Sequence, residues 1–356
     1  MRGVAGHMRG AGLAPARAQR RFLEALRLLA VGGAALAFLV VTASSRAESA
    51  YVANQGSNSV SQYTIEPLVE TLTPKTPAEV GAGTFTDGIA VSPNDMSVYA
   101  ANSSTNNISQ YTVEPVTGKL TPKTPATVST GVAPRGIVVS PDGKSLYVVN
   151  QSSDSVSQYT IEPVTERLTP KTPATIGTGS DPVRLGVTPN GKSLYVSNNS
   201  SSTVSQYTIE PVTETLTPKT PATVVTGGGP DDITVTPDGR SAYVGNSDPD
   251  VSQYTIEPVT ETLTPKTPAT VASGTGPSGV AVSPDGKSAY VANEGSSAVS
   301  QYTIEPVTET LTPKTPATVA SGTGPRGIAV STSGESLYVT DLDSNGVSQY
   351  TIQPVT

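Results

Sequence analysis

Six charged side chains lie at equivalent positions of several sequence repeats. In each repeat the position is at or near the start of a short apolar segment. The set comprises Arg135, Arg184, Arg326, Asp87, Asp231 and Asp232. Guanidinium groups can bind a carboxylate, a phosphate or sugar hydroxyls through paired hydrogen bonds. The six residues therefore predict a polar ligand-binding site. The alternative interpretation is that the arginines and aspartates only neutralise one another.

Asp231 and Asp232 are the only neighbouring carboxylates in this set, so they are the candidates for acid–base chemistry. Adjacent residues of a strand point to opposite faces, and we therefore expect the two carboxyl groups not to share a proton. One carboxylate could still assist the hydrolysis of a lactone while an arginine stabilises the negative charge that develops on the carbonyl oxygen.

Composition excludes several other kinds of site. The chain has no cysteine, and its one histidine, His7, lies ahead of the repeats. The repeats therefore cannot contain a cysteine nucleophile, a Ser-His-Asp triad or the imidazole ligands that many metal sites use. We expect no cofactor.

Residues 341–346 match the opening of a calcium-binding loop. The match offers Asp341, Asp343 and Asn345 as oxygen ligands. It is partial, because the twelfth position of the loop is Ile352 in place of glutamate, and the segment also suits the tip of a hairpin.

A sequence repeated seven times must position the candidate residues. All 14 tyrosines belong to it, in two sets that recur every 47 or 48 residues. The unit at 134–179 contains four segments typical of short strands, separated by polar turns. They span residues 136–140, 145–150, 156–161 and 168–176. Pro170 and Pro173 in the fourth segment cannot donate ladder hydrogen bonds, so this strand must lie at a sheet edge.

Seven tandem units of four antiparallel strands predict an all-β fold, a seven-bladed β-propeller, with an open solenoid as the alternative. Residues 48–356 then form one domain, and the first strand of each unit lines the channel. The middle strands occur seven times, but the first and fourth strands occur six times. We therefore expect incomplete first and last blades, unless residues 45–50 pair in part, and a weak seam between these two blades.

The repeat also resembles a known family. Residues 140–150 and 283–293 follow the pattern S-P-D-G-K-S-[LA]-Y-V-x-N, and V-S-Q-Y-T-I-E-P-V-T comes after it. This looks like the YVTN repeat of bacterial β-propellers, and its spacing is most similar to seven-bladed lactonase-like propellers such as 6-phosphogluconolactonases. The resemblance covers all seven units and implies a carbohydrate lactonase.

Lactonases of that kind often carry a histidine, typically after a proline, in the loop that enters the channel strand. The matching positions here are Arg135, Val183, Asp231, Ser278 and Arg326. The histidine of the family therefore carries over to no residue of this chain.

Residues 1–47 have the three parts of a secretory signal peptide. Six arginines precede an apolar run of 16 residues at 28–43, and Ser45-Arg46-Ala47 supplies small residues at the cleavage positions. We expect cleavage after Ala47 and a secreted or periplasmic protein. An uncleaved membrane anchor is the alternative, although the run is shorter than the ~20 residues that span a bilayer.

Charge indicates which partners to expect. Seven of the 22 basic residues but one of the 29 acidic residues lie in the leader, so residues 48–356 are strongly acidic. This argues against nucleic acid and against an anionic membrane surface as partners. We expect a monomer that binds a small molecule, a carbohydrate or a protein at the charged channel mouth, without chemistry. Lactonase-type hydrolysis and a repetitive surface or matrix protein are the alternative functions.

Overall fold

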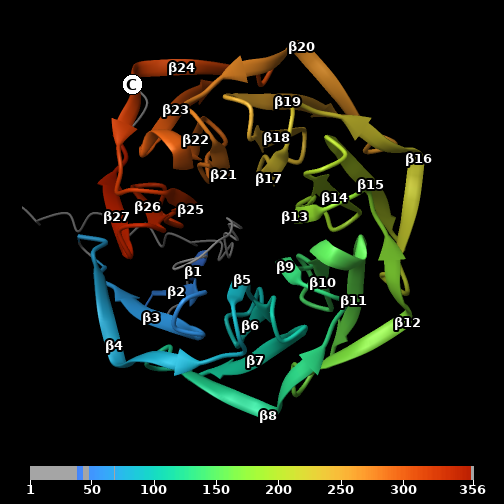
Figure 1. Cartoon of the computed structure of the whole chain (residues 1–356), viewed down its shortest axis with the longest axis vertical. Coiled ribbons are helices and arrows are strands. Elements are labelled where there is room, and N and C mark those ends of the chain that lie inside the picture. Colours follow the sequence, from blue (N-terminus) through green and yellow to red (C-terminus); the bar gives the residue numbers. More distant parts are fainter. Residues whose placement is uncertain (1–37, 43–47, 68, 354–356) are drawn as a thin grey trace, which may run out of the picture.

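The computed structural model describes residues 38–42, 48–67 and 69–353. It shows seven antiparallel sheets arranged as blades around a central axis (Figure 1). Within the described residues the elements are strands and two three-residue 3-10 helices, η1 (Gln151–Ser153) and η2 (Glu294–Ser296). The predicted all-β, seven-bladed propeller is confirmed.

Each blade runs outward from the axis in chain order. The inner strands are β1 (Phe38–Thr42), β5 (Thr86–Val91), β9 (Pro134–Val139), β13 (Pro182–Val187), β17 (Pro230–Val235), β21 (Pro277–Val282) and β25 (Pro325–Val330). The second strands are β2 (Ser49–Asn54), β6 (Ser97–Asn102), β10 (Ser145–Asn150), β14 (Ser193–Asn198), β18 (Ser241–Asn246), β22 (Ser288–Asn293) and β26 (Ser336–Asp341).

The third strands are β3 (Ser59–Ile65), β7 (Asn107–Val113), β11 (Ser155–Ile161), β15 (Thr203–Ile209), β19 (Asp250–Ile256), β23 (Ala298–Ile304) and β27 (Gly346–Thr351). The outer strands are β4 (Leu72–Gly81), β8 (Leu120–Ser129), β12 (Leu168–Gly177), β16 (Leu216–Val225), β20 (Leu263–Ala272) and β24 (Leu311–Ala320). We number the blades 1 to 7 in chain order.

The third blade shows why these residues form this sheet. Every residue of β10 is buried, because both faces of a blade pack against neighbouring blades. Its strand order is β9-β10-β11-β12, with Tyr147 opposite Gln158 and Tyr159 opposite Pro170. The proline-containing β12 lies at the outer edge of the sheet. This was predicted, because its prolines have no N–H to donate to a further strand. The core is aliphatic apart from the tyrosines.

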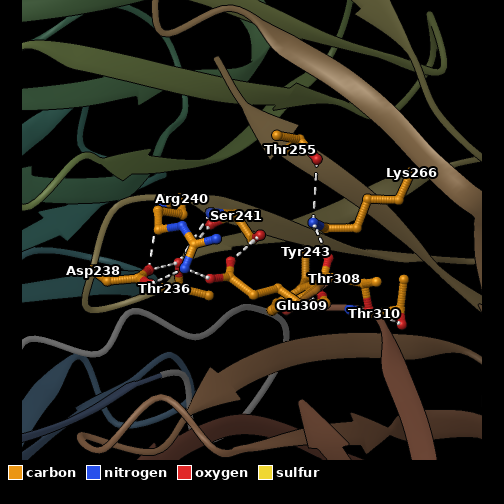
Figure 2. A network of polar contacts seen from close by, with 10 residues as sticks. All are labelled: Thr236, Asp238, Arg240, Ser241, Tyr243, Thr255, Lys266, Thr308, Glu309 and Thr310. Carbon is orange, nitrogen blue, oxygen red and sulfur yellow. Dashed lines mark hydrogen bonds and ion pairs between the residues drawn. The ribbon is translucent and has the colours of Figure 1, made fainter. Parts of the chain in front are cut away.

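Side chains tie each blade to the next at the rim. The Tyr243 hydroxyl donates to the Glu309 carbonyl at 2.7 Å, and Lys266 Nζ donates to the Thr308 carbonyl at 2.8 Å (Figure 2). Arg240 also forms an ion pair with the Glu309 carboxylate at 3.0 Å. Since these residues recur in the repeat, the tyrosine and lysine contacts recur around the ring, for example from Tyr147 and Lys171.

The two terminal blades differ from the rest. Among the described residues blade 7 has three strands, β25 to β27, as predicted. The repeats supply three strands to blade 1, also as predicted, but β1 adds a fourth by pairing with β2. This inner strand comes from Phe38–Thr42, within the segment predicted to be a leader, and not from residues 45–50. The rest of the predicted leader lies outside the described residues.

The interface of blades 7 and 1, where a weak seam was predicted, carries the contacts of the other interfaces. Between blades 7 and 1, Tyr338 donates to the Glu70 carbonyl and Leu72 N donates to Gln349 Oε1, as in the other interfaces. Blades 6 and 7 are joined by Tyr350, whose hydroxyl donates to the Ala320 carbonyl at 2.7 Å, and by Gly322 N, which donates to Ser348 Oγ at 3.2 Å.

Candidate functional site

The inner strands bring the predicted site residues to one mouth of the channel. Asp87, Arg135, Asp231 and Arg326 each occupy the second position of an inner strand, in blades 2, 3, 5 and 7. Arg184 occupies the third position in blade 4, and Asp232 does so in blade 5. Because the register of the inner strand repeats from blade to blade, these positions lie at the same end of the ring.

In the other inner strands that the repeats supply, glycine occupies the third position, because there is little space for a side chain near the axis. A Cβ atom on Gly88 would lie 2.2 Å from the carbonyl oxygen of Arg135 on the next inner strand. Arg184 and Asp232 stand where this glycine recurs. Blades 4 and 5 therefore depart from the repeat at the place where a channel ligand would meet the protein.

Asp87 is the centre of a buried ion-pair network. Its Oδ1 accepts from Arg184 Nη2 at 2.8 Å, and its Oδ2 lies 3.2 Å from Arg135 Nε. The side chains of Asp87 and Arg184 are fully buried, whereas 21% of the Arg135 side chain is exposed. Burial lowers the pKa of Arg184, and the Asp87 charge opposes that shift. The network joins blades 2, 3 and 4 and leaves Arg135 partly free to face a ligand.

Asp232 has a structural position. Its Oδ1 accepts from the amide of Ile233 and its Oδ2 from the amide of Val280, each at 2.9 Å, so it joins blades 5 and 6. The side chain is fully buried, and burial raises its pKa to about 7. Both carboxylate oxygens are occupied by backbone donors, so Asp232 is poorly placed to act on a ligand.

The surroundings of Asp231 differ from those of Asp232. This was predicted, because adjacent residues of a strand point to opposite faces. Asp231 is partly exposed, and three arginines from blades 4, 7 and 3 act on its carboxylate: Arg184, Arg326 and Arg135. Burial raises its pKa, while the arginines oppose the shift. A carboxylate held among cationic groups at a channel mouth has the surroundings that hydrolytic chemistry or anion binding needs.

Arg326 pairs with a residue that the sequence analysis did not single out. Its Nη2 lies 2.7 Å from Glu294 Oε2, and Glu294 belongs to η2 at the tip of blade 6. The signal was present in the repeat, because Gln151 and Asn199 occupy the matching position in blades 3 and 4. A charge at a variable tip position next to the mouth could have identified Glu294.

Among the calcium-loop candidates, Asp341 has a structural role. Asp341 is buried at the end of β26, where its two carboxylate oxygens accept from Ser321 Oγ at 2.8 Å and Ser348 Oγ at 2.5 Å. Asn345 has a positive φ of 50° at the hairpin tip. No cluster of three or more acidic or histidine side chains suited to a metal occurs among residues 38–42, 48–67 and 69–353. Asp341 takes the place of a structural asparagine of the other blades.

Within the described residues, no helix is long and apolar enough to cross a membrane. The segment predicted to be a leader, apart from residues 38–42, lies outside them.

Comparison with known proteins identifies a family model that matches nearly the whole chain. The family is described as "Lactonase, 7-bladed beta-propeller", and the matched residues are 40–181 and 185–356. No curated protein matches the chain.

Many solved structures share the fold. A periplasmic gluconolactonase of Pseudomonas aeruginosa is similar with a TM-score of 0.69 and 17% identity, over 92% of this chain and 93% of that one. A putative 6-phosphogluconolactonase of Bacteroides fragilis has a TM-score of 0.67 and 21% identity, over 80% and 84%. Hydrazine synthase of Kuenenia stuttgartiensis has a TM-score of 0.65 and 19% identity, over 85% and 92%. At these identities the similarity establishes the fold alone.

Proposed function

This chain belongs to the seven-bladed β-propeller lactonase family, and from that premise we propose that it hydrolyses sugar lactones at the charged mouth of its channel. The proposal replaces the expectation of a binding scaffold without chemistry as the leading interpretation. Two of the similar structures are named as a gluconolactonase and a putative 6-phosphogluconolactonase, which supports a lactone as the substrate class.

The observation that carries the proposal is the position of Asp231. The residue is partly exposed at the mouth, and arginines from three other blades act on its carboxylate. Arg135 and Arg326 also keep about a fifth of their side chains exposed, at 21% and 19%. One base and two accessible cationic groups at one opening are what hydrolysis of a neutral ester with an anionic product requires.

The reaction follows from these roles. Asp231 accepts a proton from a water molecule as the water oxygen attacks the lactone carbonyl carbon. Arg135 or Arg326 stabilises the oxyanion that forms on the carbonyl oxygen. The ring C–O bond then breaks, and the ring oxygen takes the proton back from Asp231 as it becomes a hydroxyl group. The product is a hydroxy acid; its carboxyl group loses its proton to water, and the resulting carboxylate faces the arginines.

The test is acid release from glucono-1,5-lactone, followed at constant pH with protein purified after expression of the whole chain. Because this lactone opens slowly in buffer, the rate is measured against a protein-free control. Asp231→Asn should lower kcat about 100-fold or more, in line with the contribution of a general base. Arg167→Ala, at an exposed turn on the opposite rim, is the control and should keep the rate. No turnover above the buffer rate would end the proposal.

If that assay shows no turnover, a second experiment distinguishes a binding site from a catalytic site. Gluconate, the open acid, is added to the protein and the melting temperature is recorded. Stabilisation by gluconate that disappears in Arg135→Ala and Arg326→Ala, without any turnover, would return the site to the binding scaffold that the sequence predicted.

We also propose that the chain is exported. The basic, apolar and small-residue parts of residues 1–47 support export, and so does the similarity to a protein named as periplasmic. Cleavage after Ala47 would remove β1 and leave blade 1 with β2, β3 and β4. Intact-mass measurement of the exported protein should give an N-terminus at Glu48. A mass that retains residues 38–42 would show that β1 stays in the ring and that the leader is not cut there.

A further inference from the structure

The two faces of the ring differ in charge. The mouth face is formed by the loops that lead into the inner strands and by the tips between the second and third strands. The opposite face is formed by the turns that follow the inner strands and the third strands. Among the described residues, the only basic side chains of the mouth face are those of Arg135, Arg184 and Arg326.

The other described basic residues lie on the opposite face or point toward it. Lys266 of β20 is an example, because its Nζ donates to the Thr308 carbonyl at 2.8 Å (Figure 2). The other outer-strand lysines also bond groups on that side: Lys75, Lys123, Lys171, Lys219 and Lys314. The turns of that face contain the rest: Lys119, Lys144, Arg167, Lys192, Arg240 and Lys287. None of these charges is available to a ligand at the mouth.

Acidic residues are numerous on the mouth face. The inner strands supply Asp87, Asp231 and Asp232, and the loops and tips supply Asp154, Asp181, Asp248, Glu294 and Asp343. A surface with an excess of one charge lowers the local concentration of ligands of the same charge. An anionic ligand is therefore disfavoured at this face before it makes any contact.

The three arginines do not reverse this balance, because each contacts a carboxylate. Arg184 and Arg135 share Asp87, at 2.8 Å and 3.2 Å. Arg326 Nη2 lies 2.7 Å from Glu294 Oε2. A phosphate group would have to displace one of these carboxylates or lie beside it. The hydroxyl groups of a neutral sugar can instead donate to the carboxylates and accept from the guanidinium groups.

Glu294 is the acidic residue best placed to act on a ligand. Its Oε1 and Oε2 lie 2.8 Å and 2.7 Å from Arg326 Nη2, and 34% of its side chain is exposed. Its backbone N–H donates to the Gly276 carbonyl at 2.9 Å, which ties η2 to the loop that leads into β21. The matching tip positions of the other repeats carry no charge: Gln55, Ser103, Gln151, Asn199, Ser247 and Leu342.

We propose that the mouth selects a sugar lactone without a phosphate group, and that Glu294 is the residue that excludes a phosphorylated one. The inference rests on the proposed function, because it names the substrate of the same site. Glu294 occupies the Arg326 guanidinium that would otherwise bind phosphate, and it places a like charge beside it. A site discriminates between two ligands as effectively by repelling the wrong one as by binding the right one.

The first test compares two product acids, gluconate and 6-phosphogluconate, by isothermal titration calorimetry with protein purified after expression of the whole chain. The phosphate adds nearly two negative charges at pH 7. The unaltered protein should bind gluconate at least about tenfold more tightly. This preference should shrink as salt is added, because salt screens repulsion between charges. A preference that arose from the size of the phosphate would not depend on salt.

Substitutions assign the preference to one residue. Glu294→Gln keeps the size of the side chain and removes its charge, so the Arg326 guanidinium becomes available to the phosphate. The ratio of the two Kd values should then change about tenfold in favour of 6-phosphogluconate, the effect of one charged hydrogen bond. Glu294→Asp keeps the charge and should keep the preference. Asp285→Asn removes a charge from the opposite face and should leave the ratio unchanged.

Kinetics separates this inference from the proposed function. The two lactones, glucono-1,5-lactone and its 6-phosphate, are compared by kcat/KM, and Glu294→Gln should lower KM for the phosphorylated lactone while kcat changes little. A higher kcat/KM for the phosphorylated lactone in the unaltered protein would overturn the inference and leave lactonase activity in place. A ratio that Glu294→Gln shifts no more than Asp285→Asn does would also overturn it.

Preferential binding of gluconate without turnover of either lactone would support the selection and end the proposed hydrolysis. Binding of neither acid, together with turnover of neither lactone, would overturn both.

Discussion

The buried pair of Asp87 and Arg184 gives the sharpest test of how the mouth is built. Both side chains are fully buried and their charged atoms lie 2.8 Å apart. Replacing Asp87 by alanine removes the carboxylate that contacts the buried Arg184 guanidinium. Removing one partner of a buried ion pair typically costs about 3–5 kcal/mol, because the remaining charge is not solvated. Arg135, whose Nε lies 3.2 Å from Asp87, would add its positive charge to the same place.

We therefore expect Asp87→Ala to lower the free energy of unfolding by ~3–5 kcal/mol. At ~2 °C per kcal/mol for a domain of this size, the melting temperature should fall by ~6–10 °C. Circular dichroism at pH 7 measures the change. The comparison is Lys287→Ala, which removes an exposed ion pair at 3.9 Å whose partner Asp285 is 56% exposed. That variant should lose at most ~1 kcal/mol.

A double-mutant cycle separates the pair from its surroundings. Arg184→Met removes the buried charge, and adding Asp87→Ala to it should cost much less than Asp87→Ala costs alone. The reasoning is refuted if Asp87→Ala is no worse than Lys287→Ala, or if the two mouth substitutions add without coupling. Either result would mean that the charges are solvated in the channel and do not hold blades 2, 3 and 4 together.

Three further predictions concern the ring. Tyr195→Phe removes a 2.6 Å bond to the Glu261 carbonyl and should cost ~1 kcal/mol in urea unfolding; no loss would mean that the blade contact is redundant. Gly88→Ala should cost ~1–3 kcal/mol through overpacking, whereas Gly81→Ala, whose Cβ would meet nothing within 4 Å, should be near neutral; equal effects would contradict the crowding at the axis. The Asp232 pKa, raised by burial to about 7, means that the folded state holds a proton that the unfolded state releases near pH 4. Stability should therefore fall from pH 4 to 7, by up to ~4 kcal/mol from this group, and Asp232→Asn should flatten the slope in melts at graded pH.

The sequence predicts the ring well because each strand of the unit occurs six or seven times in the repeats. Two tyrosines per unit give the period of the repeat. Pro170 and Pro173 identify the outer strand because they have no N–H to donate to a neighbouring strand. The terminal segment is harder to interpret. The apolar run at residues 28–43 is compatible with a signal peptide and with an inner strand. Hydrophobic periodicity alone does not distinguish the two, so β1 was not predicted.

The positions of the six charged residues were predicted, but their pairing was not. Equivalent positions in a repeat placed the six charged residues at one mouth, since a ring brings equivalent positions together. Pairing across blades depends on side-chain reach, which the repeat does not encode. The Arg326–Glu294 pair was therefore missed. The burial of Asp232 against the Val280 amide likewise depends on the neighbouring blade.

The tyrosine contacts carry a consequence for how such a chain can change length. Each joins one unit to the corresponding place in an adjacent unit, as Tyr147 to Glu214 and Tyr195 to Glu261 do. Unequal recombination that deletes or duplicates a whole unit would therefore recreate the same junction without any compensating substitution. The mouth sets the limit on such changes, because the Asp87 network takes one residue from each of units 2, 3 and 4. Loss of any of these three units would break the network even though the tyrosine junction would form again.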